Sequence, residues 1–109
     1  MTIQPRDVVR LWDRYTSPNK HKLHICVCDE RQLFLRINSD PVFAPVHPLS
    51  QKNNSFLHHD SYVELQQLVR HMSEEIREAE HIGRISRAEA SALVATSNNA
   101  QTLSPNTSA

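Results

Sequence analysis

The chain has 109 residues, which argues for one domain, and its 12 Lys and Arg balance its 12 Asp and Glu to a formal net charge of zero. A single glycine, Gly83, excludes a glycine-rich phosphate loop, and with it the Rossmann and P-loop nucleotide enzymes. The zero charge argues against a bulk duplex-DNA binder, and no stretch approaches the roughly 20 apolar residues of a membrane span. Charged residues interrupt the first apolar run, so no signal peptide is expected, and two cysteines are too few for a secreted disulfide scaffold. We therefore expect a cytoplasmic protein without a membrane partner.

Charge is distributed unevenly along the chain. The first 40 residues hold seven Lys or Arg against five Asp or Glu, whereas residues 71–109 hold three against five. The N-terminal part is therefore the mildly basic end of the chain.

Three runs near the N-terminus have the composition of β-strands. Asp7–Trp12 is rich in β-formers and follows a proline, and both Lys22–Cys28 and Gln32–Asn38 alternate between two faces. Only Asp29–Arg31 separates the second run from the third, which predicts a tight antiparallel hairpin.

The hairpin has a predicted register. With Glu30 at the centre of the turn, each strand contributes three partners: Cys26 with Phe34, His24 with Arg36, and Lys22 with Asn38. Three-residue loops often carry a bulge, which would shift the pairing next to the turn.

The middle of the chain changes character at Asp40. Three prolines between Asp40 and Ser55 predict a long irregular connection and confine any strand there to a sheet edge. The next segment, Asp60–Leu65, fits either a capping box or a short strand entering a helix.

The second half is predicted to be helical. A helical spacing of apolar residues predicts a helix from about Gln66 to Ala79, ended by Gly83 in a left-handed conformation. A capping-box pattern at Ser86 predicts a short helix from about Arg87 to Ala95. The polar residues 96–109 are predicted to be a disordered tail, which leaves residues 1–95 as the domain.

Five pieces of the chain appear in an order that resembles a known family. The segment from Gln4 to Trp12 resembles its first strand, and the segment from Tyr15 to Lys22 its first loop. Leu23–Cys28 and Phe34–Ser39 resemble its second and third strands, and Ile82–Ser86 resembles the turn into its last helix. The family is the MazF/PemK toxins of type II toxin–antitoxin systems.

The resemblance spans roughly residues 4–95 and implies a β-rich α+β fold. The expected architecture is an SH3-like small β-barrel with a helix after the barrel strands and a short C-terminal helix. It also implies a homodimer that cleaves single-stranded RNA without a metal or other cofactor and is neutralised by an antitoxin protein. The family has a short strand where Tyr62–Glu64 stand, which favours the strand at that position.

The resemblance also suggests catalytic residues. The family pairs an Arg at the end of the first loop with a Thr or Ser at the end of the third strand. Lys22 stands at the arginine position, Asn38 or Ser39 stands at the other, and Arg6 replaces the family's glycine before Asp7. Lys22 would stabilise phosphate charge, Asn38 or Ser39 would position the phosphate, and a histidine would move protons. The candidates for that histidine are His21 and His24.

A basic groove for RNA is a further expectation. Exposed aromatic rings beside basic side chains suit single-stranded nucleic acid, although Trp12 could equally be a core residue. The candidate RNA-binding residues are Arg10, Arg14, Lys20, Arg36 and Tyr15.

The sequence also raises a metal site and a second function. His21, His24, Cys26 and Cys28 lie close together in sequence, but their spacing is not that of a structural zinc site, so no metal is predicted. The alternative function is a non-catalytic PemK-like module that binds a protein partner, for example in phage defence or its counteraction, because the Arg, Thr and Gly positions are all substituted.

Overall fold

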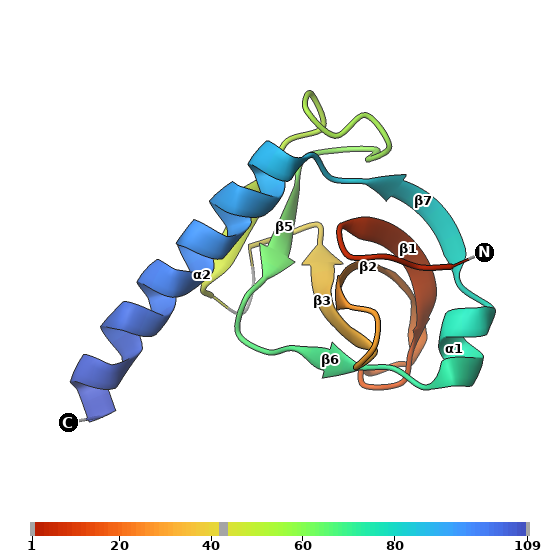
Figure 1. Cartoon of the computed structure of the whole chain (residues 1–109), viewed down its shortest axis with the longest axis horizontal. Coiled ribbons are helices and arrows are strands. Elements are labelled where there is room, and N and C mark those ends of the chain that lie inside the picture. The colour runs from red at the N-terminus through yellow and green to blue at the C-terminus, as the bar shows by residue number, and fades with distance from the viewer. Residues whose placement is uncertain (1, 42–43, 109) are drawn as a thin grey trace.

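Three antiparallel strands from the N-terminal part form the centre of a strongly curved sheet (Figure 1). They are β1 (Asp7–Asp13), β2 (Lys20–Cys28) and β3 (Leu33–Asn38), which confirms the three predicted strands. The computed structural model describes residues 2–41 and 44–108, with side chains described as far as residue 98.

Two of the three predicted pairs of the β2–β3 hairpin are confirmed, and the pairing of Lys22 with Asn38 stays a prediction. Cys26 pairs with Phe34 and His24 pairs with Arg36, and the register shifts between Cys26 and Cys28. Gln32 adopts a positive φ of 58°, and its N–H donates to the carbonyl of Asp29 at 3.2 Å. A left-handed residue that closes a short loop next to a bulge is the usual geometry of such hairpins.

Four short strands extend the sheet on both sides. They are β4 (Val46–Leu49), β5 (Ser61–Glu64), β6 (Val69–Arg70) and β7 (Glu80–Arg84). The strand order is β4-β5-β3-β2-β1-β7, with β6 also paired to β3, and every pair is antiparallel. Along this path β4 and β7 are the two ends within the described residues. The fold is therefore β-rich α+β, and a closed SH3-like barrel stays a prediction.

The proline-rich connection contains an edge strand, as its sequence allows. β4 pairs on one side only among the described residues, so Pro48 interrupts no interior ladder. The preference for a strand at Tyr62 is also confirmed, because β5 covers that segment.

The helix predicted from about Gln66 to Ala79 is wrong. β5 and β6 instead lie one after the other along the same edge of β3, and only α1 (Ser73–Arg77) is helical. Leu68 and Met72 remain about half exposed, so the helical apolar stripe is not buried as a face. The backbone of this segment hydrogen-bonds the free edge of β3, which outweighs the local helical periodicity.

The segment between β5 and β6 bulges away from β3. Ile37 pairs with Val63 and Phe34 pairs with Val69, so β3 advances three residues while its partner advances six. The extra residues lie at the edge of the cleft described below.

Gly83 does not end a helix, which corrects the sequence-based prediction. It lies in β7 opposite Val8, and no glycine has a positive φ within the described residues. A Cβ at this position would lie 2.5 Å from Cδ2 of Phe56, so the glycine makes room for an aromatic ring. The left-handed conformation occurs at Arg6 instead, with φ 78°, in a turn closed by the N–H of Asp7.

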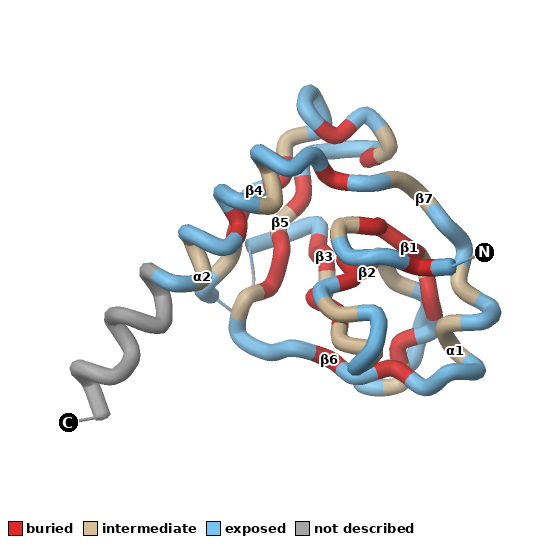
Figure 2. The backbone as a smooth tube through the Cα atoms, in the orientation of Figure 1, coloured by how far each residue is buried: buried red, intermediate tan, exposed pale blue. Residues whose placement is uncertain are grey.

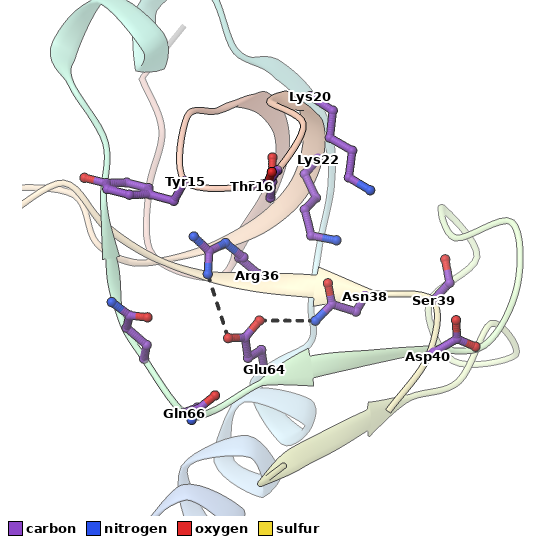
Figure 3. A pocket seen from close by; sticks show the side chains of 12 residues that line it. Tyr15, Thr16, Lys20, Lys22, Arg36, Asn38, Ser39, Asp40, Glu64 and Gln66 are labelled. Carbon is purple, nitrogen blue, oxygen red and sulfur yellow. Dashed lines mark hydrogen bonds and ion pairs between the residues drawn. The ribbon is translucent and has the colours of Figure 1, made fainter. Parts of the chain in front are cut away.

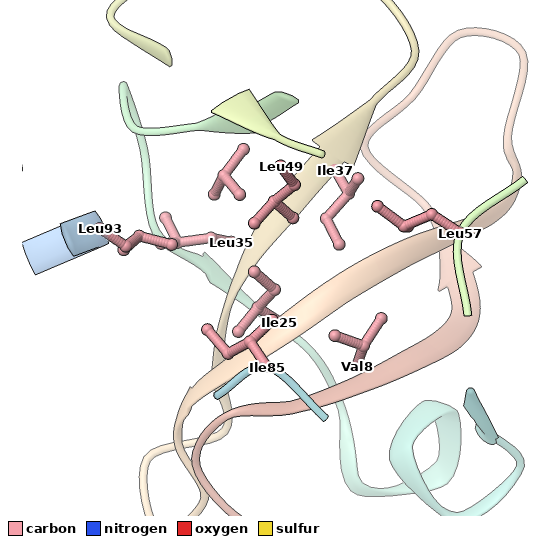
Figure 4. Close-up of a cluster of buried hydrophobic side chains, with 9 residues drawn as sticks. Val8, Ile25, Leu35, Ile37, Leu49, Leu57, Ile85 and Leu93 are labelled. Atoms are coloured by element: carbon pink, nitrogen blue, oxygen red, sulfur yellow. The ribbon is translucent and has the colours of Figure 1, made fainter. Parts of the chain in front are cut away.

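Buried residues occur along most strands of the sheet and fall into two core clusters (Figure 2). The larger core lies on the concave side and gathers apolar residues from six elements and the loops between them (Figure 4): Val8, Ile25, Leu35, Ile37, Leu49, Leu57, Val63, Ile85 and Leu93. The smaller core contains Ile3, Val9, Leu11, Cys26 and Phe34, with Ile76 and Ala79 packed against it. Neighbouring residues of β1, β2 and β3 thus point into different cores, which fixes the curvature of the central strands.

The C-terminal helix α2 (Arg87–Ser108) begins at the predicted cap. The N–H of Glu89 donates to Oγ of Ser86 at 3.0 Å. The helix contacts β4, where His47 lies 2.8 Å from Oε2 of Glu89 and 2.9 Å from Oγ1 of Thr96. It continues past the expected end at Ala95, while disorder of residues 96–109 stays a prediction. No described helix has the length and apolar character needed to cross a membrane.

Candidate functional site

A cleft of about 630 Å³ opens where the β1–β2 loop, the end of β3 and the segment after β5 meet (Figure 3). Six of the sequence-predicted site residues line it: Tyr15, Lys20, Lys22, Arg36, Asn38 and Ser39. The remaining lining residues are polar or acidic: Thr16, Ser17, Asp40, Glu64, Gln66 and Gln67. The cleft therefore joins parts of the chain that are about 50 residues apart in sequence.

Two lysines from the start of β2 supply cationic charge to the cleft. Lys20 is exposed and Lys22 is partly buried, and neither forms an ion pair with a described carboxylate. Burial lowers the pKa of Lys22, and the neighbouring charge of Lys20 lowers it further. Their ammonium groups are the cations in this cleft that are free to meet an anionic ligand.

Arg36 is held rigidly, unlike the lysines. Its Nε donates to Oδ2 of Asp13 at 2.6 Å, and its Nη1 lies 3.8 Å from Oε1 of Glu64. Burial by itself would raise the pKa of Asp13, but the neighbouring His24, the guanidinium of Arg36 and the backbone N–H of Tyr15 keep that pKa well below its ordinary value. Asp13 is therefore a permanent anion that fixes the guanidinium and offsets part of its charge.

The two residues at the end of β3 differ in burial and in hydrogen bonding. Asn38 is buried, and its Nδ2 donates to Oε2 of Glu64 at 3.2 Å. Ser39 is exposed, and its Oγ lies 3.5 Å from Nε2 of His59. Ser39 is thus the freer hydrogen-bond donor toward a ligand, while Asn38 is part of the cleft wall.

His59 does not line the cleft but contacts Ser39 beside it, and it is not among the site residues predicted from the sequence. Its Nδ1 lies 2.9 Å from the carbonyl oxygen of Asp60, so this nitrogen carries the proton and donates it to the carbonyl. The lone pair of a neutral His59 is then on Nε2, the atom that faces Ser39. In the sequence, the only notable feature of His59 is its neighbour Asp60. No local pattern predicts that the segment before β5 contacts the end of β3.

Tyr15 provides an aromatic ring at the rim of the cleft. It is 52% exposed, its hydroxyl donates to the carbonyl of Arg70 at 3.1 Å, and Cζ of Arg14 lies 4.5 Å from its ring centroid. A tethered, half-exposed ring of this kind is a surface on which a nucleobase can stack.

Four other candidates lie outside the cleft. Arg10 pairs with Glu80 and Arg14 pairs with Glu75. His21 packs edge-on against the ring of Trp12, at a second hollow lined by three glutamates of α1 and its end: Glu74, Glu75 and Glu78. His24 is completely buried.

Trp12 is not a core residue, since it is 40% exposed, but the hollow beside it is acidic and does not suit a polyanion. Among the residues that the structure describes, neither cysteine belongs to the group of potential metal ligands. Cys26 lies in the smaller core, where burial raises the pKa of its thiol to about 12.

A group of three potential metal ligands includes Asp13, the partner of Arg36. One ligand atom from each of Asp13, His24 and His71 lies within 4.8 Å of the others.

No family model matches the chain, and no curated protein matches it.

Proposed function

We propose that the chain is a divergent MazF/PemK-like toxin that cleaves single-stranded RNA in the cleft around Lys22. The observation that carries the proposal is the meeting of two unpaired lysine ammonium groups, an exposed serine hydroxyl and a half-exposed tyrosine ring in one cleft. Cationic charge beside stacking surfaces is what a single-stranded nucleic acid requires. The proposal includes an SH3-like barrel, a homodimer and neutralisation by an antitoxin protein.

The reaction needs no metal ion. The 2′-hydroxyl attacks the adjacent phosphorus, so a bond from the 2′ oxygen to phosphorus forms and the bond to the 5′ oxygen breaks. One group must take the proton of the 2′-hydroxyl, and another must give a proton to the departing 5′ oxygen. The products are a 2′,3′-cyclic phosphate and a 5′-hydroxyl.

The role of each residue follows from whether other side chains already hold it in place. Lys22, supported by Lys20, stabilises the negative charge that develops on the phosphoryl oxygens. Ser39 donates a hydrogen bond to the phosphate, and His59, whose Nε2 carries the lone pair, accepts the proton of the 2′-hydroxyl. The ammonium group of Lys22, whose pKa is lowered by burial, gives a proton to the departing 5′ oxygen. Arg36 holds the wall of the cleft through Asp13 and Glu64 and adds positive potential.

The test is cleavage of a mixed-sequence single-stranded RNA by purified protein in EDTA, with circular dichroism to verify that the protein stays folded. We expect fragments with 2′,3′-cyclic phosphate and 5′-hydroxyl ends, and no cleavage of a DNA of the same sequence. A folded protein that leaves varied RNA sequences intact would defeat the proposal, and fragments with 5′-phosphate ends would defeat the mechanism.

A second candidate is a non-catalytic PemK-like module that binds a protein partner. It is favoured by one observation, namely that Glu64 engages both Arg36 and Asn38, which leaves the cleft fewer free donors than a phosphate site usually offers. A folded protein that binds RNA without cutting it, or that binds none, would favour this candidate.

A further inference from the structure

Two buried histidines point their Nε2 atoms toward each other. His24 from β2 and His71, which follows β6, are both completely buried, and their Nε2 atoms lie 3.2 Å apart. Their rings are nearly perpendicular, at 85°. The hydrogen-bond partners of the two Nδ1 atoms determine whether each Nε2 atom carries a proton or a lone pair.

His24 must carry a proton on Nδ1. That nitrogen lies 2.9 Å from the carbonyl oxygen of Lys22, which can only accept a hydrogen bond. A neutral His24 therefore has its lone pair on Nε2, and this atom also lies 3.1 Å from Oδ2 of Asp13, a carboxylate acceptor.

His71 has the same arrangement. Its Nδ1 lies 3.3 Å from Oε1 of Glu75, a carboxylate held by the N–H of Met72 and by Arg14. The N–H is therefore on Nδ1, and the lone pair is on Nε2. Lone pairs from His24, His71 and Asp13 thus converge in the protein interior, where they repel one another unless a cation lies between them.

We propose that Asp13, His24 and His71 bind one divalent transition-metal ion of the zinc type. Zinc–nitrogen bonds measure about 2.0–2.1 Å, so two ligand atoms at tetrahedral angles lie roughly 3.3 Å apart. The separations of 3.2 Å between the two Nε2 atoms and 3.1 Å between Nε2 of His24 and Oδ2 of Asp13 agree with that spacing, and the third pair, His71 and Asp13, lies within 4.8 Å. Two imidazoles and one carboxylate suit zinc and its neighbours in the first transition series rather than Mg²⁺.

The groups around the three ligands fit the same role. A metal-bound histidine normally donates its other N–H to a carbonyl or carboxylate, as His24 does to Lys22 and His71 does to Glu75. Asp13 keeps its charge and has lone pairs for both Arg36 and a metal ion.

The position of the site indicates a structural ion. Asp13 ends β1, His24 lies in β2 and His71 precedes α1, so a bound ion would join three segments that are far apart in sequence. The rings of Phe34 and Tyr15 pack edge-on against His71, with centroids 5.6 and 6.1 Å away. The ion would therefore be separate from the RNA chemistry proposed for the cleft, and would support it only by holding Asp13 against Arg36.

The experiment uses the full chain without a histidine tag, freed of metal by a chelator that is then removed. Zn²⁺ is titrated by calorimetry, with Mg²⁺ as the comparison ion, and thermal unfolding is followed with each. We expect one Zn²⁺ per chain and a rise in the unfolding temperature of at least about 5 °C at saturation, with no effect of Mg²⁺. Co²⁺ in place of Zn²⁺ should show the visible absorption of a tetrahedral site.

Two variants distinguish this site from adventitious zinc binding. His71→Gln should weaken Zn²⁺ binding at least about 100-fold, whereas the matched control His58→Gln, at an exposed histidine, should leave it unchanged. Should His71→Gln not fold, Glu75→Gln removes the hydrogen bond to His71 and should weaken binding about 10- to 100-fold.

The alternative cation is a proton shared between the histidines. The proposal is overturned if Zn²⁺ and Co²⁺ neither bind at one per chain nor raise the unfolding temperature, or if His58→Gln reduces binding as much as His71→Gln. It is equally overturned if nitrogen NMR finds His24 protonated on both ring nitrogens with Zn²⁺ present. None of these outcomes depends on RNA cleavage, so the two proposals fail separately.

Discussion

Lys22 and Arg36 bring the same charge to the cleft, but they differ in how much of it a ligand can use. Arg36 already bonds Asp13 and approaches Glu64, whereas Lys22 has no described ion-pair partner. An arginine would give a phosphate two parallel hydrogen bonds, and a lysine gives a mobile point charge. The cleft thus depends on Lys22 for charge and on Arg36 for shape.

The role of His59 gives a prediction for one side chain. His59→Ala should lower the rate of RNA cleavage about 10²- to 10⁴-fold with little change in RNA binding, because it removes the proton acceptor beside Ser39. Added imidazole should restore part of the rate. The adjacent His58→Ala is the matched control and should cleave normally, and equal losses in both variants would contradict the assignment.

Gly83 gives a prediction about packing. Gly83→Ala should lower the free energy of unfolding by about 1–3 kcal/mol, because the new methyl group meets the ring of Phe56. Urea denaturation measures the loss, and adding Phe56→Leu should recover part of it. A variant as stable as the parent would show that the ring moves aside without cost.

At the residue scale, the sequence predicts which side chains could take part in the chemistry better than it predicts their burial and contacts. The sequence predicts that Lys22, Asn38 and Ser39 lie together, and they do line one cleft. It does not predict the role of His59, because Ser39 lies 20 residues earlier and no local pattern records that contact. His24 is predicted to carry protons but is buried, because both faces of β2 are covered at this point.

At the element scale, predictions succeeded where local signals agreed with the available pairing. The alternation of β2 and β3 and their short loop fixed the register from His24 to Cys26. The segment from Gln66 to Ala79 failed because its helical period competed with the unpaired edge of β3, and a local period carries no information about that edge.

The start of α2 offers a test at this scale. Ser86→Ala should lower the free energy of unfolding by about 1 kcal/mol, because the N–H of Glu89 loses its acceptor. Ser91→Ala is the matched control at an exposed interior position of the same helix, and it should change stability by less than about 0.5 kcal/mol. Equal effects of the two changes in thermal unfolding would mean that Ser86 is not the cap in solution.

At the scale of the whole molecule, the cleft is a product of sheet topology. β3 pairs with β2 on one edge and with β5 and β6 on the other, so the bulged segment after β5 faces the loop before β2 across the end of β3. The sequence could supply only the β2–β3 half of this arrangement, because the other half depends on pairing between residues 24 to 37 positions apart. The buried group of Asp13, His24 and His71 arises in the same way, from three segments with no shared motif.

The central claim is that Lys22 in this cleft promotes cleavage of single-stranded RNA. The most direct measurement is the cleavage rate of Lys22→Ala compared with Lys52→Ala, an exposed lysine outside the cleft, on the same RNA in EDTA with folding verified. We predict that Lys22→Ala lowers the rate at least about 100-fold, while Lys52→Ala stays within about twofold of the parent. Equal rates for the two variants, or no cleavage by the folded parent, would contradict this account.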